Sequence, residues 1–230
     1  MNENSKINKK SHSQKKPKAY IEGIQDFYGR NFIVTPDVLI PRPETEQIID
    51  MILSLVGKPY LPGVKPEKPK LPNNPIVLDV GTGSGCIAIT IKKELPESTV
   101  YASDISKKAI RIAQKNAAKH NATIHTIISY LLENVNVKPD IIAANLPYVD
   151  KKWDWLDKTA LSFEPSIALY AEENGLKLIK ELIAQANQIH TRYLLLESDP
   201  CQHEAIKKYA SKYDYNLIEN KGYILAFELK

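Results

Sequence analysis

Four consecutive residues, Asn145, Leu146, Pro147 and Tyr148, have the types and the position for chemistry on a nitrogen atom. They follow an apolar run, Ile141–Ala144, that predicts a buried strand, so they should stand at its carboxyl end. In an open α/β sheet that edge is where ligands bind. The Asn145 side chain offers one acceptor and two donors, in a turn stiffened by Pro147 and walled by the Tyr148 ring. Such a turn could hold a planar nitrogen.

An amide nitrogen is a poor nucleophile because its lone pair is delocalised into the carbonyl group. Asn145 Oδ1 and the main-chain carbonyl of Leu146 could accept hydrogen bonds from both N–H groups and orient the lone pair towards a methyl donor. Alignment of this kind contributes on the order of 7–11 kcal/mol to catalysis. It requires neither a metal ion nor a covalent nucleophile, so the turn itself is the predicted catalytic site.

A glycine-rich turn about 60 residues upstream is the second chemical feature. Its sequence is Asp79-Val80-Gly81-Thr82-Gly83-Ser84-Gly85. It follows a predicted strand and opens a predicted helix, and the glycines let a ligand approach the main chain closely. The third glycine comes one position earlier than in the dinucleotide pattern. This spacing favours S-adenosylmethionine over NAD, because S-adenosylmethionine has no pyrophosphate group.

Asp104 ends the next predicted strand, 19 residues after Gly85. A carboxylate in this position can accept hydrogen bonds from both hydroxyls of a ribose. The alternative is that the glycines only pack a helix on a strand and that Asp104 is a helix N-cap. The combination of both features favours a cofactor site.

The elements that must position these residues alternate between strands and helices. Strands are predicted at 76–80, 99–103, 123–128, 141–144 and 193–197, and helices at 86–93, 107–120, 175–188 and after Cys201. Two further strands, 214–219 and 223–229, should form a closing hairpin through residues 220–222. The pattern predicts an α/β fold, a Rossmann-like mixed sheet of seven strands with helices on both faces. The antiparallel ending is typical of class I S-adenosylmethionine-dependent methyltransferases.

The chain before this domain divides into three predicted parts. Residues 1–19 form a basic tail that is expected to be disordered, because it has almost nothing apolar to bury. Residues 20–57 should form a hairpin around Gly29 and Pro36 and a helix beginning near Pro43, which pack on the methyltransferase domain of residues 76–230. Residues 58–75 hold six prolines and are predicted to be a stiff surface connection.

Charge and composition limit the partners. The net charge of +4 is concentrated in residues 1–19, which carry six lysines against one glutamate, so the body is near −1. The tail offers weak contact with nucleic acid, although a solvated leader is the favoured interpretation. No apolar stretch approaches the roughly 18–20 residues that span a bilayer, and no signal peptide is evident. Two cysteines make neither a disulfide framework nor a zinc site. We expect a cytoplasmic monomer without membrane contact.

Several blocks of residues 20–230 resemble the bacterial release-factor glutamine methyltransferases. The blocks are Tyr20-Ile21-Glu22-Gly23, Phe27-Tyr28-Gly29, Leu39-Ile40-Pro41-Arg42-Pro43-Glu44-Thr45-Glu46, Asp79 to Gly85, Asn145 to Tyr148, Phe163-Glu164-Pro165 and Leu194-Leu195-Leu196-Glu197. Residues 41–46 discriminate best, because the related ribosomal-protein glutamine methyltransferases differ there. The resemblance implies methyl transfer from S-adenosylmethionine to the side-chain N5 of the glutamine in the Gly-Gly-Gln motif of peptide chain release factors.

The resemblance also assigns residues to both ends of the site. The implied cofactor residues are Asp79, Gly81, Thr82, Gly83, Gly85, Asp104, Ile105, Tyr130, Leu131 and Asn145. The implied substrate-binding residues are Arg42, Pro43, Glu44, Thr45, Asn145, Leu146, Pro147 and Tyr148. The chain departs from the family in having Leu146 for a proline and no carboxylate in Ser129-Tyr130-Leu131, and the family's N-terminal helical domain is not expected in it.

Two other interpretations stay open. The spelling Asn-Leu-Pro-Tyr is that of ribosomal-RNA adenine methyltransferases, although the 41–46 block and the near-neutral body favour a protein substrate. A cofactor-binding relative that has lost catalysis is the other alternative. Glu197 is either a ligand-edge residue or a cap of the next helix, Trp153 and Trp155 either form a lid or pack locally, and His203 is expected on a helix surface.

Overall fold

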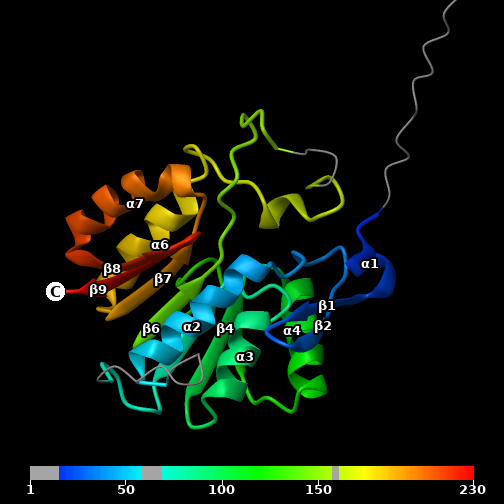
Figure 1. Ribbon diagram of the computed structural model, residues 1–230, viewed down its shortest axis with the longest axis horizontal. Helices are drawn as coiled ribbons and strands as arrows, with labels where there is room; N and C mark the ends of the chain where they lie inside the picture. The colour runs from blue at the N-terminus through cyan, green and yellow to red at the C-terminus, as the bar shows by residue number, and fades with distance from the viewer. Residues whose placement is uncertain (1–15, 59–68, 157–160) are drawn as a thin grey trace, which may run out of the picture.

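A seven-stranded mixed sheet forms the centre of the computed structural model, which describes residues 16–58, 69–156 and 161–230 (Figure 1). The strands, in the order β5-β4-β3-β6-β7-β9-β8, are β3 Ile76–Val80, β4 Thr99–Asp104, β5 His125–Ile128, β6 Ile141–Ala144, β7 Tyr193–Glu197, β8 Tyr215–Lys221 and β9 Ile224–Leu229. β9 runs antiparallel to β7 and β8, whereas the other pairs of this sheet are parallel. The predicted mixed seven-stranded sheet is confirmed.

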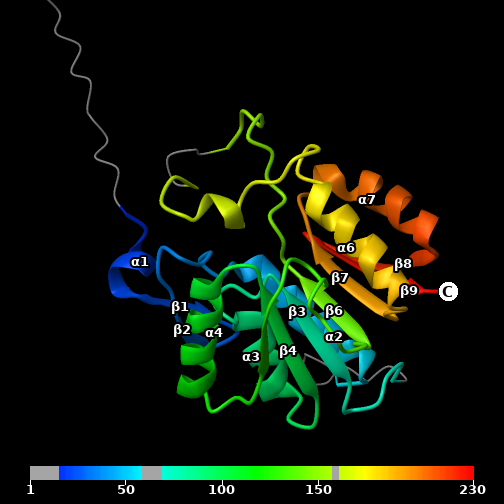
Figure 2. The ribbon, with the colours of Figure 1, turned by 180° about the vertical axis from the view of Figure 1, so that it is seen from behind.

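Helices cover both faces of this sheet (Figures 1 and 2). They are α2 Glu46–Leu55, α3 Cys86–Glu94 and α4 Lys107–Lys119 on one face, and α6 Lys177–Gln188 and α7 His203–Ala210 on the other. Successive residues of a strand point to opposite faces. Val77 accordingly packs in the core under α2 and α3, whereas its neighbour Leu78 packs in the core under α6 and α7. Each strand therefore contributes to two cores.

The N-terminal part lies beside α4 (Figure 1). It comprises α1 Lys18–Glu22 and a hairpin of β1 Ile24–Phe27 and β2 Arg30–Ile33. The buried amide of Asn116 on α4 joins this hairpin to the domain: its Oδ1 accepts from Ile33 N at 2.7 Å, and its Nδ2 donates to the carbonyls of Ile33 and Ser84. The hairpin around Gly29 was predicted, but it ends at Ile33, and residues 34–42 hold no strand.

Helix α2 begins with a short 3₁₀ turn, η1 Pro43–Thr45. Pro43 suits this first turn because its missing N–H would have no partner there. Ile48, Ile49 and Ile52 are fully buried at helical spacing, in the same apolar cluster as Val77. This packing anchors the block 41–46 at a defined place above the sheet.

Three element boundaries differ from the predictions. β8 continues through Lys221, so the closing turn lies at Gly222 and Tyr223 and not at residues 220–222. α6 begins at Lys177 because Gly175 precedes it with a φ of +80°. η3 Pro200–Gln202 precedes α7, and η2 Ser166–Ala168 and η4 Ser211–Tyr213 are further 3₁₀ turns. Most of the predicted basic tail (residues 1–15) and of the proline-rich connection (residues 59–68) lies outside the described residues.

None of the helices in the described ranges is long and apolar enough to span a bilayer.

Candidate active site

The glycine-rich turn lies between the carboxyl end of β3 and the start of α3. Gly81 N and Thr82 N both donate to Ser103 O on β4 at 2.9 Å, which fixes the start of the turn. Gly81 and Gly85 have φ values of +75° and +82°, which favour glycine. A Cβ on Gly85 would also lie 3.2 Å from the main chain of Ala113 on α4. The turn is therefore held close to its neighbours on both sides.

Asp79 supports this turn from beneath and does not line the pocket above it. Its Oδ2 accepts from Thr82 Oγ1 at 2.6 Å and from Ala88 N at 3.1 Å. Burial raises the pKa of Asp79 to about 7. Its Oδ1 is buried and receives no hydrogen bond within the described ranges. Asp79 thus ties the turn to the first residues of α3.

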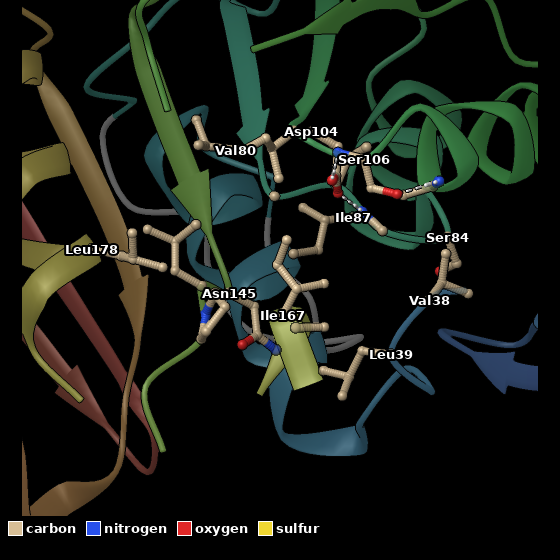
Figure 3. Close-up of a pocket in the computed structure, with 18 of the residues that line it drawn as sticks. Val38, Leu39, Val80, Ser84, Ile87, Asp104, Ser106, Asn145, Ile167 and Leu178 are labelled. Atoms are coloured by element: carbon tan, nitrogen blue, oxygen red, sulfur yellow. Dashed lines mark hydrogen bonds between the residues drawn. The ribbon is translucent and has the colours of Figure 1, made fainter. Parts of the chain in front are cut away.

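Asp104 lies at the end of β4 and lines the pocket, as predicted (Figure 3). Its Oδ2 accepts from Gly83 N at 2.9 Å and its Oδ1 from Ser106 N at 2.8 Å. Burial raises the pKa of Asp104. The N-cap of α4 is Ser106, whose hydroxyl accepts from Ala109 N, so the alternative that Asp104 is the N-cap is wrong.

One pocket joins the glycine turn to the Asn145 turn, with a cavity volume of about 270 Å³ (Figure 3). Of the predicted site residues it is lined by Arg42, Thr45, Gly81, Thr82, Gly83, Asp104, Ile105, Tyr130, Leu131, Asn145, Leu146 and Pro147. Five predicted residues do not line it: Asp79, Gly85, Pro43, Glu44 and Tyr148. The structure therefore brings most of the predicted cofactor and catalytic residues to one cavity.

Tyr130 and Leu131 form the pocket wall beyond β5. The Tyr130 hydroxyl donates to Glu181 Oε2 on α6, and this bond raises the pKa of Tyr130 to about 12. Leu131 is buried and has a φ of +45°, an uncommon value for a leucine. Ile105, on the neighbouring strand end, is half exposed. These three residues present an apolar surface next to Asp104.

The Asn145 amide is held by a hydrogen-bonded chain from two distant parts of the sequence. Asn145 Nδ2 donates to Thr45 Oγ1 at 3.0 Å, and Thr45 Oγ1 donates to Glu197 Oε2 at 2.6 Å. Within the described part of the chain, no hydrogen bond to Asn145 Oδ1 is present. Asn145 lines the pocket, so this acceptor is available to a ligand (Figure 3).

Glu197 is the buried end of that chain, with 2% of its surface exposed. Its other oxygen, Oε1, accepts from the Tyr148 hydroxyl at 3.3 Å. Burial raises the pKa of Glu197 to about 7, although both hydrogen bonds favour its charged form. It does not cap the next helical turn, because Asp199 accepts from Cys201 N there. The sequence left two interpretations open for Glu197, and these contacts exclude the helix cap. Glu197 stands at the carboxyl end of β7 but does not line the pocket.

Leu146 and Tyr148 both pack in the apolar cluster beneath α6 and α7. Leu146 is 5% exposed, and its Cδ2 lies 3.0 Å from where a Cβ on Gly81 would stand. Leucine at this position therefore fills space against the glycine turn and links the two motifs. The Tyr148 carbonyl accepts from Gln202 Nε2 at 2.8 Å, and a Cβ on Gly175 would clash with the same carbonyl.

The block 41–46 divides between the pocket and the surface. Arg42 and Thr45 line the pocket, whereas Pro43 and Glu44 are exposed and do not line it. Arg42 forms an ion pair with the buried Glu164, which also accepts from Ile40 N at 3.3 Å. Burial raises the pKa of Glu164, and the nearby guanidinium opposes this shift.

The sequence pattern indicated no role for Glu164 or Gln202. Glu164 belongs to a block that matches the family, which was the only signal for it. Gln202 carried no signal, because its contacts with Tyr148 and Asn174 arise only in the fold. His203 was expected on the surface, and this was wrong: it is 6% exposed, and burial lowers its pKa.

The two tryptophans of the chain pack on each other. The rings of Trp153 and Trp155 are stacked with their centroids 5.0 Å apart, and neither ring lines the pocket. The local packing interpretation fits this geometry. Among the described residues, no group of three or more His, Cys, Asp and Glu side chains could hold a metal ion.

Comparisons with known proteins identify relatives of this chain. Residues 68–163 match the model of the methyltransferase small domain. The chain is 44% identical over 172 residues to a release factor glutamine methyltransferase of Koribacter versatilis, which covers 74% of this chain and 57% of that protein. It is 39% identical over 215 residues to a bifunctional methyltransferase of Rickettsia typhi, covering 87% of this chain and 41% of that protein. The chain thus spans about half the length of these relatives.

A solved structure supports the fold class. A methyltransferase from Pyrococcus furiosus superposes with a TM-score of 0.61 and 16% identity, covering 88% of this chain and 90% of that one.

A release factor glutamine methyltransferase of Neisseria gonorrhoeae is 36% identical over 208 residues, which cover 88% of this chain and 71% of that protein. By this similarity, the chain belongs to the release factor glutamine methyltransferase family.

Proposed function

We propose that this chain transfers a methyl group from S-adenosylmethionine to N5 of the glutamine in the Gly-Gly-Gln motif of a peptide chain release factor. The observation that carries the proposal is the placement of Asn145. Its Nδ2 is bound to Thr45, and its Oδ1 is left without a partner in the described chain, in the same cavity that Asp104 and the glycine turn line. Family membership, at 36–44% identity, supports the choice of substrate.

The residues of the glycine half fit S-adenosylmethionine. Each Asp104 oxygen accepts one main-chain hydrogen bond and keeps lone-pair capacity for a ribose hydroxyl. Gly81 and Gly83 expose main chain to the cavity, and Ile105 and Leu131 offer apolar contact to a purine. When bound, the cofactor would supply a methyl carbon activated by its sulfonium and would leave as a neutral thioether.

The Asn145 turn would prepare the substrate amide. Asn145 Oδ1 would accept one N–H of the glutamine side chain, and the main-chain carbonyl of Leu146 would accept the other. Two acceptors in fixed positions turn the nitrogen lone pair out of the amide conjugation and towards the glycine half of the cavity. The new N–C bond uses that lone pair, and the amide proton then leaves to water, so no side chain needs to act as a base.

The remaining block would shape the entrance of the cavity. The Arg42–Glu164 pair joins residues 41–46 to the segment after Phe163, and both Arg42 and Ile167 line the cavity. This segment lies above the carboxyl edge of the sheet (Figures 1 and 2). A flexible protein loop that carries a glutamine could therefore enter between residues 41–46 and the segment that contains η2.

We also propose the cytosol as the place of action and a monomer as the active form. Cys86 and Cys201 are both free thiols, which suits a reducing compartment. The basic tail holds six lysines in the first 19 residues, whereas the rest of the chain has a net charge near −1. We therefore propose only a weak contact with nucleic acid, through this tail.

Transfer of a labelled methyl group to a purified release factor tests the function. We expect labelling of the Gly-Gly-Gln form and none of a Gln→Ala form of the same factor. Asn145→Ala should abolish the labelling. Equal labelling of both forms, or labelling of ribosomal RNA instead, would contradict the proposal.

A further inference from the structure

A single proton decides which way the Asn145 amide faces. The Thr45 hydroxyl has one proton, and it donates that proton to Glu197 Oε2 at 2.6 Å. Its lone pairs are therefore what Asn145 meets, at 3.0 Å, and lone pairs attract the amide NH₂ and repel the amide oxygen. The two ends of an asparagine amide are nearly the same size, so packing alone does not choose between them.

We propose that Glu197 is a positioning residue that acts through Thr45 to hold the Asn145 amide with its oxygen facing the pocket. This inference rests on the proposed function, because the oxygen is the atom that would accept the substrate N–H. Glu197 itself touches neither the substrate nor the cofactor in this arrangement. Its contribution is to accept the hydrogen bond from the Thr45 hydroxyl. This acceptance sets the direction of both hydrogen bonds, from Asn145 to Thr45 and from Thr45 to Glu197.

The burial of Thr45 and Glu197 makes this hydrogen-bonded chain directional. Thr45 and Glu197 are each 2% exposed, so water cannot easily replace either hydrogen bond. The second oxygen of Glu197 accepts from the Tyr148 hydroxyl, so the carboxylate is held from two sides. An acceptor that is fixed in this way keeps the Thr45 proton pointed away from Asn145.

Protonation of Glu197 would reverse the polarity. A neutral Glu197 can donate to Thr45, which frees the hydroxyl proton to face Asn145 and favours the flipped amide. Burial raises the pKa of Glu197 to about 7, so this change falls near neutral pH. The titratable and charged groups around it are Tyr148 on its hydrogen bond, Glu44 and Arg42 from the η1 segment, and Cys86 at the start of α3.

The test compares two buried threonines. Thr45→Val removes the hydroxyl with little change of shape, and Thr90→Val makes the same change at a fully buried threonine on α3 whose hydroxyl has no partner among the described residues. We expect Thr45→Val to lower kcat for methyl transfer on the order of 10–100-fold. KM should stay within about threefold, because most contacts with a protein substrate lie elsewhere. Thr90→Val should leave kcat and KM unchanged. Thr45→Ser keeps the hydroxyl and should retain most of the wild-type kcat.

The pH dependence separates positioning from mere packing. In the wild-type protein kcat should rise with pH through an apparent pKa near 7, as Glu197 ionises. Both Thr45→Val and Glu197→Gln should lose this rise, because each breaks the link between ionisation and the amide. A Thr45→Val protein with wild-type kcat, or with the wild-type pH profile, would overturn the proposal.

A spectroscopic readout keeps the proposal testable without turnover. In ¹⁵N-labelled protein, the side-chain NH₂ signals of Asn145, identified by their loss in Asn145→Ala, should shift between about pH 6 and 8 in the wild type and in Thr45→Ser. They should stay constant in Thr45→Val. Signals that do not move in the wild type would overturn the inference. If the signals move but no release factor is methylated, the positioning stands and the proposed function fails.

Discussion

Leu146 is the residue whose removal tests the packing of the site most clearly. It stands where the family has a proline, it is 5% exposed, and it packs in the core beneath α6. Leu146→Ala should therefore leave a cavity and lower the free energy of unfolding by about 2–5 kcal/mol. For a domain of this size that loss corresponds to a fall in Tm of roughly 2–4 °C per kcal/mol.

The same substitution should weaken cofactor binding. The Leu146 Cδ2 lies against Gly81, so its loss should loosen the glycine turn that we propose as part of the cofactor site. Urea unfolding followed by circular dichroism measures the stability, and calorimetric titration with S-adenosylhomocysteine measures the affinity. Leu217→Ala is the matched control, because Leu217 on β8 is 38% exposed and should cost less than about 1 kcal/mol.

The two leucines must behave differently if this reasoning is sound. A loss below about 1 kcal/mol for Leu146→Ala, similar to that of the control, would show that the turn does not depend on this side chain. Unchanged affinity for S-adenosylhomocysteine would refute the contact between Leu146 and the glycine turn as a support for the cofactor site.

Two further predictions concern carboxylates, the partly buried Asp104 and the buried Glu197. Asp104→Ala should weaken S-adenosylhomocysteine binding on the order of 10–100-fold, because a charged acceptor at the pocket is lost. Asp26→Ala, at an exposed residue, is the control. Equal affinities of the two variants in calorimetry would contradict the role assigned to Asp104. Burial raises the pKa of Glu197 and Asp79 to about 7 from 4.5 and 3.8. Between the unfolded and the folded pKa values, the folded state therefore holds protons that the unfolded state has released. The stabilisation from these groups is complete below the unfolded pKa values and is lost as the pH rises through 7. Glu197→Gln should make the fall in unfolding free energy between about pH 5 and 7.5 shallower by up to about 3 kcal/mol, and an equally steep fall would count against the raised pKa.

The sheet, and the placement of the glycine turn and Asp104 at one pocket, were largely predictable because their signals are local. Apolar runs such as Ile141–Ala144 and the glycine turn at Gly81 depend on neighbours in the sequence, and parallel strands bring their carboxyl ends to one edge. Asp104 at the end of β4 follows from that rule alone. The boundaries of helices were less predictable where a contact with a distant residue determines them. One example is the start of α6, which follows Gly175, a residue that lies against the Tyr148 carbonyl.

The network behind Asn145 was not predictable in the same way. Thr45 and Glu197 are 152 residues apart, and their hydrogen bond depends on how α2 packs on the sheet. Residue type indicated only that Glu197 stands at the ligand edge. His203 was misplaced on the surface because residue type alone does not show that the first residue of α7 is buried in the fold. Long-range packing therefore supplies the network that we propose to orient the Asn145 amide.

The most direct test of the account is methyl transfer to a release factor by the wild-type chain and by Asn145→Ala. The account predicts one labelled methyl group on the glutamine of Gly-Gly-Gln, located by mass spectrometry of the peptide, and no label with Asn145→Ala or with a Gln→Ala factor. Label on another residue, label on ribosomal RNA, or undiminished transfer by Asn145→Ala would contradict it.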